Sequence, residues 1–427
     1  QFVNAQVVKF LSIYLKQQVS LMDRKNVDIA IIGAGPAGLS FALSLAKTGL
    51  KIVLVDQQGL ESIAKPQLDG RDIAMTHLSK TILSELNVWQ RFPDDAVHPI
   101  KEAKVINGPL SSTKNTSTKH SWLTTPALHF ERTDDAQAPL GYLVANFQIR
   151  QALYDQALEF DNIEIITEQQ VEYVKTFANR GVIETNDYTI NASLVVSADS
   201  RFSTTRRMMG LSAKMKDFGK VMIVCNMKHQ LSHDNTAQEC FQYGRTCAIL
   251  PLGEGYSSIV ITVPASEAKR LTDLPIEEFN RQANEMFDGR LGEMELITER
   301  HSYPLVGVIS DRFIGKRFAL IGDAAVGMHP VTAHGYNLGL RSADTLAEQI
   351  IKAQQAGKDI ASSWVLHNYE VRHQLLSKPL YEATNAIVDL YTNDKPLAKI
   401  ARKAALHVGN KFMPFKHLVT HRLTQIR

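Results

Sequence analysis

Near its start the chain alternates apolar runs of strand length with a segment of helical periodicity. Residues 27–32 (VDIAII) form a mostly apolar run, and a glycine-rich segment follows at once. Beyond it, apolar residues recur at helical spacing: Leu39, Ala42, Leu43 and Ala46. Gly49 ends this helix, and a second apolar run at 51–55 ends in Asp56. The pattern predicts a strand–turn–helix–strand unit with an acidic residue after its second strand.

Later segments predict a chain that leaves this sheet and rejoins it. Residues 194–199 repeat the pattern of a buried strand that ends in an acid, and strand patterns dominate from 221 to 263. From residue 344 onward the pattern is helical. We therefore expect an α/β fold in which a Rossmann-like nucleotide-binding domain is interleaved with a β-rich domain. The expected boundaries are an extension at 1–22, which is either disordered or a short interfacial helix, the nucleotide-binding domain at 23–95, 141–210 and 301–350, the β-rich domain at 96–140 and 211–300, and C-terminal helices at 351–427.

The glycine-rich turn after the first strand suits a dinucleotide. Gly33, Gly35 and Gly38 have the spacing GxGxxG between a strand and a helix. Glycines there permit a tight turn and close approach of the backbone to a pyrophosphate, and the helix start offers free N–H groups and a partial positive charge. Asp56 lies eighteen residues past the last glycine, where an acid accepts a ribose hydroxyl. This context favours nucleotide binding over a turn that binds nothing.

A second motif, almost three hundred residues later, narrows the choice of nucleotide. The segment GDAA at 322–325 is followed by His329-Pro330 and by GYNLGL at 335–340. Asp323 follows an apolar strand, so its carboxylate should emerge at the carboxyl edge of the sheet, where such folds bind ligands. The helix that begins after 335–337 can donate its first N–H groups to a ligand. The two motifs together indicate FAD, held at both ends.

Composition excludes several other classes of protein. The chain has 427 residues, of which 44% are hydrophobic, and this is too long for one small core. Its net charge of +3 is too small to imply nucleic acid. The cysteines, Cys225, Cys240 and Cys247, form no CxxC pair, which fits a reducing compartment. Because GxSxG, HExxH and tight His/Cys clusters are missing from the sequence, we expect no side-chain nucleophile and no metal.

At this point the chain resembles the FAD-dependent aromatic hydroxylases of the para-hydroxybenzoate hydroxylase fold, and within them the ubiquinone-biosynthesis hydroxylases. Besides the two motifs, the resemblance rests on DGRDIAM at 69–75, LGYLVANFQIRQAL at 140–153, VVSADSRFSTTR at 195–206, ILPL at 249–252 and YPL at 303–305. The segment 327–340 is most similar to the demethoxyubiquinol 5-hydroxylase branch. The resemblance implies an FAD-binding domain interleaved with a β-rich substrate domain.

The resemblance also implies roles for individual positions. The implied cofactor-binding residues are Gly33, Gly35, Gly38, Asp56, Arg71, Arg150, Asp199, Gly322, Asp323, Gly335, Tyr336 and Asn337. The first three glycines would hold the pyrophosphate, and Arg71 and Arg150 would contact the phosphate and ribityl region. The side chain of Asp323 would bind the ribityl chain, and the turn at 335–337 would face the pyrimidine edge of the flavin.

Three residues are expected beside the flavin ring, namely His329, Pro330 and His334. Either histidine would tune the proton of a phenol or hold a structural hydrogen bond, and both interpretations stay open. The chain also departs from the family pattern near the ring. Ser200 stands where the family usually has glycine, and Val326 replaces a histidine. These departures leave the substrate-positioning residues unassigned.

The implied reaction is monooxygenation, in which a flavin C4a-hydroperoxide formed from O₂ hydroxylates an electron-rich aromatic ring. The expected substrate is a lipophilic phenol or quinol, such as demethoxyubiquinol. A second GxGxxG after a strand is missing, so the reductant is either transiently bound NAD(P)H or a protein electron donor. The alternatives are a flavin dehydrogenase or reductase without oxygen insertion, and a non-catalytic FAD-bearing assembly subunit. A halogenase is disfavoured because Trp89, Trp122 and Trp364 are isolated rather than paired as Trp-x-Trp.

The C-terminal segment bears on location. Residues 395–427 contain eight Lys or Arg residues and no Asp or Glu. One interpretation is a packed helix with a solvated basic face, and the other is a tail that touches an anionic membrane surface or other ubiquinone-biosynthesis proteins. We expect a cytoplasmic protein, peripheral at the inner face of the membrane.

Overall fold

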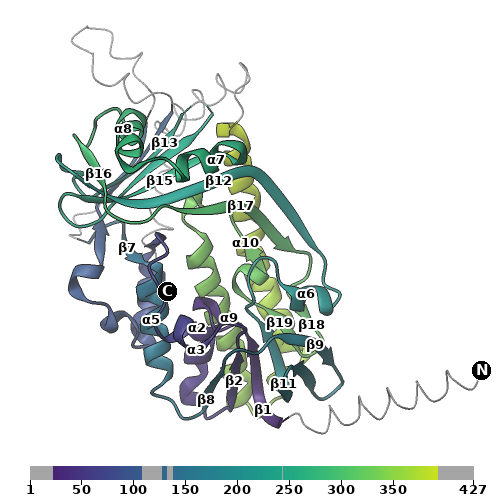
Figure 1. The fold of residues 1–427 in the computed structure, drawn as a ribbon. Coiled ribbons are helices and arrows are strands. Elements are labelled where there is room, and N and C mark those ends of the chain that lie inside the picture. Colours follow the sequence, from purple (N-terminus) through teal and green to yellow (C-terminus); the bar gives the residue numbers. More distant parts are fainter. Residues whose placement is uncertain (1–22, 108–126, 132–137, 243, 393–427) are drawn as a thin grey trace, which may run out of the picture.

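The computed structural model describes residues 23–107, 127–131, 138–242 and 244–392. The predicted extension at 1–22 and the basic segment at 395–427 lie outside these residues. In the described part, the chain forms three β-sheets and helices that cover them, which confirms the α/β class (Figure 1).

The first sheet is built around parallel strands. Its order is β18-β19-β11-β1-β2-β8, and β10 and β9 extend it from β11. The pairs of β1 with β11 and β2, of β2 with β8, and of β11 with β19 are parallel. The strands are β1 (Asp23–Ile32), β2 (Ile52–Val55), β8 (Ile163–Ile166), β9 (Val171–Thr176), β10 (Gly181–Thr185), β11 (Tyr188–Ser197), β18 (Ile314–Gly315) and β19 (Phe318–Leu320).

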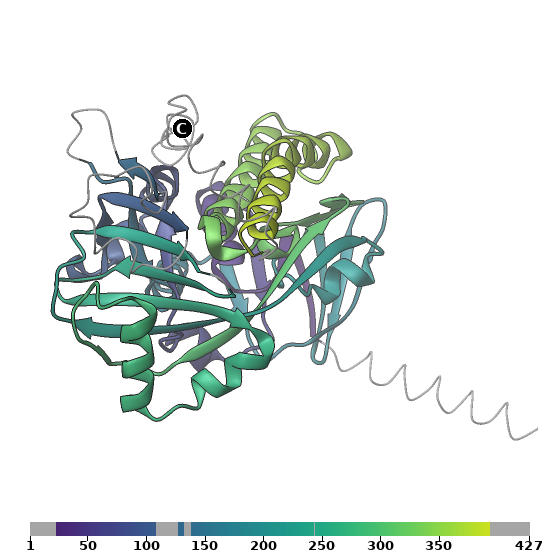
Figure 2. The same ribbon diagram turned by 90° about the horizontal axis from the view of Figure 1, so that it is seen from above.

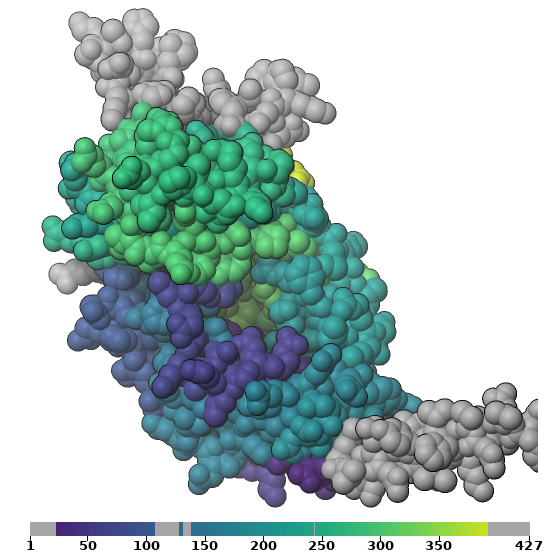
Figure 3. All heavy atoms as spheres, viewed as in Figure 1, coloured from purple at the N-terminus to yellow at the C-terminus, as the bar shows by residue number. Residues whose placement is uncertain are grey.

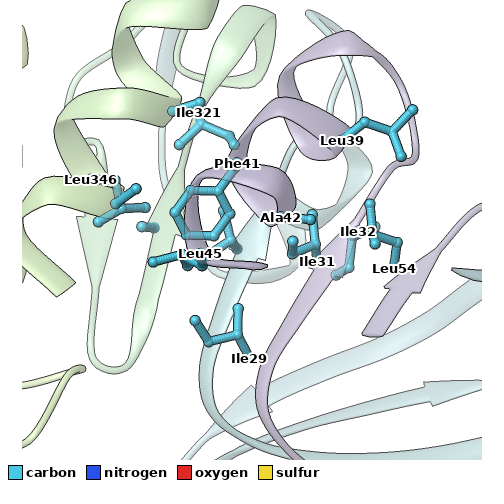
Figure 4. Packing of buried hydrophobic residues seen from close by; sticks show 14 of the residues in the cluster. Ile29, Ile31, Ile32, Leu39, Phe41, Ala42, Leu45, Leu54, Ile321 and Leu346 are labelled. Carbon is cyan, nitrogen blue, oxygen red and sulfur yellow. The ribbon is translucent and has the colours of Figure 1, made fainter. Parts of the chain in front are cut away.

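Helix α2 (Pro36–Leu45) packs against this sheet and determines where the first turn points. Its side chains Phe41 and Leu45 are fully buried, with Ile29 of β1 and Leu346 of α9 (Gly335–Gln355) among their neighbours (Figure 4). Burying a side chain of this size stabilises a fold by roughly 1.5–3 kcal/mol. The predicted strand–turn–helix–strand unit is therefore confirmed as one packed unit.

The other helices surround the same core. Helix α9 contacts both α2 and α10, and α9 and α10 lie side by side (Figure 2). The remaining helices are α3 (Leu60–Ala64), α4 (His77–Glu85), α5 (Asn146–Ala157), α6 (Thr204–Met208), α7 (Ala265–Thr272), α8 (Ile276–Met286) and α10 (Ser363–Thr392). Short 3-10 turns, η6 (Gly322–Ala324) and η7 (Pro330–Thr332), follow β19 and precede α9.

A nine-stranded sheet forms the second layer, with α7 and α8 on its outer side (Figure 1). Its order is β20-β17-β12-β15-β14-β13-β5-β6, and β16 pairs with β12. The strands are β5 (Glu102–Asn107), β6 (Ala127–Glu131), β12 (Ala213–His229), β13 (Thr236–Phe241), β14 (Thr246–Pro251), β15 (Tyr256–Pro264), β16 (Met294–Leu296), β17 (His301–Ser310) and β20 (Val326–Gly327).

A small sheet joins the two layers. It has the order β3-β7-β4, with β3 (Asp72–Met75), β4 (His98–Ile100) and β7 (Gly141–Ala145). The predicted nucleotide-binding segment 301–350 begins with β17, which pairs with β12 in the nine-stranded sheet. The strand β12 has 17 residues, about 55 Å at the usual rise, so it and its partner extend from one domain toward the other. The predicted domain boundaries all stay predictions.

Among the described residues, none of the helices combines the length and the apolar character that crossing a membrane requires. The described residues also contain no group of three or more His, Cys, Asp or Glu side chains arranged to hold a metal ion.

Candidate functional site

A cavity of about 750 Å³ lies between the nine-stranded sheet and the turns that follow β1 and β19. In Figure 3 the surface is hollowed between the green segments of that sheet and the purple segments around α2. The predicted site residues that line the cavity are Gly35, Asp56, Arg71, Arg150, Gly322, Asp323, His329, Pro330, Gly335 and Tyr336. Five others do not line it, namely Gly33, Gly38, Asp199, His334 and Asn337.

Two of the first three glycines are required by protein packing. Gly33 has φ +107°, and a Cβ there would lie 2.6 Å from the carbonyl oxygen of Ala198. A Cβ on Gly38 would collide with the carbonyl oxygen of Gly33. Because neither residue has a side chain, helix α2 can approach β1 and β11 closely. Gly33 and Gly38 thus determine the shape of the turn, and neither faces the cavity.

Gly35, the middle glycine, faces the cavity instead. Its φ of −76° suits any residue, and a Cβ there would meet nothing within 4 Å. Gly35 is also the N-cap of α2, with no side-chain cap and with Pro36 as the next residue. The open space therefore lies directly in front of a helix start, which presents N–H groups and a partial positive charge. This is the space and the charge that a pyrophosphate needs.

The carboxylate of Asp56 stands at the end of β2, beside this space. It accepts hydrogen bonds from the backbone N–H of Ala34 (2.7 Å) and of Gln58 (2.8 Å). These bonds hold the carboxylate rigidly while each oxygen keeps a second lone pair for a hydroxyl donor. The geometry fits a ribose next to the pyrophosphate.

The turn at 322–323 packs on both α2 and α9. Gly322 has φ +59°, and a Cβ there would lie 2.8 Å from the Cβ of Ala37. Its N–H donates to the hydroxyl of Ser342 on α9 (2.9 Å). The carboxylate of Asp323 faces the cavity and accepts a hydrogen bond from Arg201 (2.7 Å), which the sequence analysis did not assign to the site. The signal for Arg201 was its place in the VVSADSRFSTTR segment.

The start of α9 forms another part of the cavity wall. A Cβ on Gly335 would meet nothing within 4 Å, and Leu338 is the first residue whose N–H bonds back, to His334 (2.8 Å). The N–H groups of residues 335–337 precede the first turn of hydrogen bonds and suit an electron-rich ligand edge. Tyr336 lines the cavity, and its buried hydroxyl has no hydrogen-bond partner among the described residues, so burial raises its pKa.

The side chain of Asn337 does not line the cavity and forms hydrogen bonds with other parts of the fold. Its Nδ2 donates to the carbonyl oxygens of Ala74 (2.8 Å) and Ala333 (2.7 Å). Its Oδ1 accepts from the N–H of Thr76 (3.0 Å) and the hydroxyl of Ser79 (2.7 Å). The amide therefore ties α9 to β3 and α4, and it sets the position of the helix start rather than lining the cavity.

Of the three residues expected beside the flavin ring, two line the cavity and one does not. His329 and Pro330 line the cavity, whereas His334 does not. Burial, together with the cations Lys216 and Arg201, lowers the pKa of His329 to about 4. Its Nδ1 accepts the N–H of Val331 (3.2 Å), so the neutral ring carries its proton on Nε2. His334 has a buried Nδ1 without a partner among the described residues, and burial lowers its pKa as well.

Arg71 and Arg150 both line the cavity, and contacts with neighbouring residues hold each guanidinium group in place. Arg71 forms an ion pair with Asp69 (2.5 Å) and lies over the ring of Tyr303, 5.1 Å from its centroid. Arg150 donates to the carbonyl oxygen of Ser62 (3.1 Å), and burial lowers its pKa. Both guanidinium groups can face phosphate oxygens, which their planar arrangement of N–H donors suits.

The carboxylate of Asp199 lies away from the cavity. It accepts from the hydroxyl of Ser197 (2.5 Å) and from the N–H of Thr205 at the start of α6 (3.1 Å). The next residue, Ser200, has φ +76°, a conformation that favours glycine. Because serine stands here where the family usually has glycine, the backbone of this turn is strained.

The sheet wall of the cavity holds residues that the sequence analysis missed. Side chains at every second position of β12 to β15 face the cavity: Met222, Val224, Glu239, Phe241, Thr246, Ala248, Leu250, Ser258, Val260 and Thr262. Asp72 of β3 also lines it, and burial raises its pKa to about 6. The alternation was readable in the sequence, but both faces of this sheet are largely apolar, so periodicity did not indicate which face looks into a cavity.

Comparison with known proteins extends this picture. A family model described as FAD binding domain matches residues 26–383. The ubiquinone hydroxylase UbiM of Neisseria meningitidis is 46% identical over 402 residues, covering 93% of this chain and 84% of that protein. The ubiquinone hydroxylase UbiL of Rhodospirillum rubrum is 30% identical over 398 residues, covering 92% and 88%. The crystal structure of p-nitrophenol 4-monooxygenase from Pseudomonas putida has the same fold, with a TM-score of 0.72 at 18% identity over 95% of this chain and all of that one.

Proposed function

Because this chain belongs to the family of FAD-dependent ubiquinone hydroxylases, we propose that its cavity takes a lipophilic quinol such as demethoxyubiquinol and that one oxygen atom is added to the ring. The chain is thus a flavoprotein monooxygenase by family, and the particular ring position and substrate are the proposal. The single observation that carries it is the open space at Gly35 and Gly335, two helix starts that face one cavity of about 750 Å³ beneath an apolar sheet.

The residues present fit FAD at each part of the molecule. The start of α2 at Gly35 would receive the pyrophosphate, and Asp56 the adenosine ribose. Asp323 would bind the ribityl chain, and the N–H groups at Gly335 would face the pyrimidine edge of the flavin. When bound, FAD supplies the two-electron chemistry and the activation of O₂ that hydroxylation requires.

The protein's own contribution is to orient the ring and exclude water. The apolar side chains of Met222, Val224 and Val260 line the wall on which a ring would lie. They remove water from the reacting faces without offering a competing nucleophile. His329 stays neutral above about pH 4, so it can hold a hydrogen bond to a ring oxygen but adds no positive charge near neutral pH.

The number of dinucleotide fingerprints in the sequence bears on the source of electrons for the flavin. We propose NAD(P)H, bound transiently, or a protein electron donor, because the sequence carries one dinucleotide fingerprint and the proposed FAD site uses it. Anaerobic mixing of the holoprotein with NADH or NADPH checks this directly. Bleaching of the flavin by either nucleotide supports direct reduction, and bleaching only by a protein donor supports the other route.

We further propose that the protein works at the inner face of the membrane, on the cytoplasmic side, because its substrate is lipophilic. Other ubiquinone-biosynthesis proteins are the candidate partners there. Co-sedimentation with vesicles that do and do not contain anionic lipid tests this location. Binding that is the same for both vesicles and insensitive to salt removes the electrostatic part of the proposal.

The decisive experiment is turnover of a short-chain demethoxyubiquinol under isotopically labelled O₂. We expect a product heavier by one labelled oxygen, formed only by protein that retains FAD. Gly35→Val provides the matched control, since its side chain would fill the pyrophosphate space. Oxidation of the reductant without any oxygenated product would assign the chain to the flavin reductases instead, and a bound flavin that no donor reduces would leave a non-catalytic subunit.

A further inference from the structure

The sheet wall of the cavity carries an acidic side chain that neither the proposed cofactor site nor the packing explains. Glu239 lies on β13 and lines the cavity. Among the described residues its carboxyl group has no hydrogen-bond or ion-pair partner. Glu239 is half-buried in the cavity wall, where an unpaired carboxyl group loses part of its hydration, and an apolar side chain would pack there at lower cost. Its presence therefore calls for a ligand that supplies the missing partner.

The surroundings of Glu239 have the shape and polarity that suit an aromatic ring. Ala248 lies directly opposite on β14, and Val105 is its partner on β5. Two residues along the same strand, Phe241 faces the same side and packs on Tyr391, with ring centroids 4.3 Å apart. Val331, which follows the cavity residue Pro330, belongs to the same apolar cluster. A ring held in this region meets the carboxyl group of Glu239 at one edge, beside the neutral hydroxyl of Thr246.

The protonation of Glu239 follows from its apolar surroundings. Burial raises its pKa to about 8, with no charged group contributing to the shift. The thiols of Cys240 and Cys247, on β13 and β14, stay protonated because burial raises each pKa to about 12. The cations Arg245 and Lys220 at the end of the wall donate to a glutamine side chain (2.7 Å) and to a backbone carbonyl (3.2 Å). Asp56, Asp72 and Asp323 are the other acids that line the cavity. The Ser258 hydroxyl beside Asp72 lowers the pKa of that carboxyl group against the effect of burial.

We propose that Glu239 is a specificity-determining residue whose carboxyl oxygen accepts a hydrogen bond from a hydroxyl group on the substrate's aromatic ring. The inference rests on the proposed function for the ring chemistry, and it selects phenols and quinols over rings whose oxygens are all methylated. At neutral pH the carboxyl group is neutral and does not repel a polar ring. Above about pH 8 it becomes a carboxylate, and its hydrogen bond to the hydroxyl strengthens.

The test measures binding rather than turnover, so it does not depend on the proposed reaction. FAD-loaded protein is titrated with 2-methoxyphenol and with 1,2-dimethoxybenzene, and the change in flavin absorbance gives each dissociation constant. The wild type and Glu239→Gln are both expected to prefer the phenol by about tenfold at pH 7, because each offers an acceptor oxygen. Glu239→Leu is expected to lose the preference. Glu254→Gln, on an exposed turn of the same sheet, is the matched control and should bind like the wild type.

A second arm varies the pH. Between pH 7 and pH 9 the wild-type preference is expected to rise several-fold as Glu239 ionises, while that of Glu239→Gln stays level. An undiminished preference in Glu239→Leu overturns the proposal, and so does a wild type without any preference. If Glu239→Leu does not retain FAD, the pH arm decides alone, because a rise in Glu239→Gln equal to the wild-type rise also overturns it. Protein that shows these preferences but makes no oxygenated product retains the inference and refutes the hydroxylase function.

Discussion

Replacing Gly35 by alanine should weaken FAD binding, whereas replacing Gly38 by alanine should lower the stability of the fold. The middle glycine has φ −76°, and its added Cβ would meet nothing within 4 Å. The third glycine would place its Cβ against the carbonyl oxygen of Gly33, well inside the 3.0 Å that Cβ atoms keep. One methyl group therefore enters the proposed pyrophosphate space, and the other enters the contact between α2 and the turn after β1.

The magnitudes follow from these contacts. At Gly35, alanine reduces the entropy of the unfolded chain by about 0.4–1 kcal/mol but is a poorer N-cap than glycine, so the two effects nearly cancel. The apo-protein should keep its stability within about 1 kcal/mol. Losing one hydrogen bond to a charged phosphate costs about 1.5–3 kcal/mol, so FAD should bind roughly 10- to 100-fold more weakly. At Gly38, overpacking against backbone should cost about 3 kcal/mol or more of folding stability.

The assay is urea denaturation of both apo-variants, followed by titration of each folded apo-protein with FAD. Flavin fluorescence gives the dissociation constant. Wild-type affinity in Gly35→Ala would show that the pyrophosphate does not lie in front of α2. Equal losses of stability in the two variants would refute the division of roles between the glycines.

Three further outcomes are expected. Asp323→Asn should weaken FAD binding about tenfold, measured by equilibrium dialysis, yet change stability by less than about 1 kcal/mol, because its pair with Arg201 is about 30% exposed. For His329, the folded pKa of about 4 lies below the ordinary 6.5, so the unfolded chain binds more protons between these values and stability falls as pH drops through that window. His329→Gln should remove up to roughly 3 kcal/mol of this acid sensitivity in urea titrations from pH 7 to pH 4. Ser200→Gly should raise the free energy of unfolding by about 1 kcal/mol, since Ser200 has φ +76°, whereas Ser200→Ala should not.

The backbone features of the site could be predicted because short-range chemistry determines them. Glycine spacing encodes the turn after β1, and an acid after an apolar run encodes a carboxylate at a strand end. Gly35, Asp56 and Asp323 accordingly line one cavity although they come from distant segments. Family resemblance supplied the pairing of the two motifs, and the topology brings them together because both follow parallel strands of one sheet.

The side-chain roles were harder to predict because tertiary neighbours decide them. The side chain of Asn337 does not line the cavity, because Ala74, Thr76 and Ser79 around β3 and α4 form hydrogen bonds with its amide. Asp199 follows a strand just as Asp323 does, yet α6 begins beside it and takes its carboxylate. Nothing local distinguishes these acids and amides from those that face the cavity.

The substrate wall was missed for a different physical reason. Ile223 and Cys225 on β12 pack under α7 and α8, whereas Met222 and Val224 on the same strand line the cavity. Both sets are apolar, so the period of two identifies a strand but not which face meets helices. The packing of α7 and α8 on one face of the sheet shows that the opposite face lines the cavity.

The difference between backbone-determined and side-chain-determined parts of the site affects how substrate specificity can change by mutation. The proposed cofactor contacts include backbone N–H groups at two helix starts, which most side-chain substitutions leave intact, together with the carboxylates of Asp56 and Asp323. The proposed substrate contacts are side chains on the inner face of β12 to β15, where one substitution alters polarity without moving the backbone. Glu239 is such a position, since its carboxyl group has no partner among the described residues and holds no other element in place. A change there should alter which rings bind while FAD affinity stays the same, and that separation is what the paired variants of Glu239 and Gly35 measure.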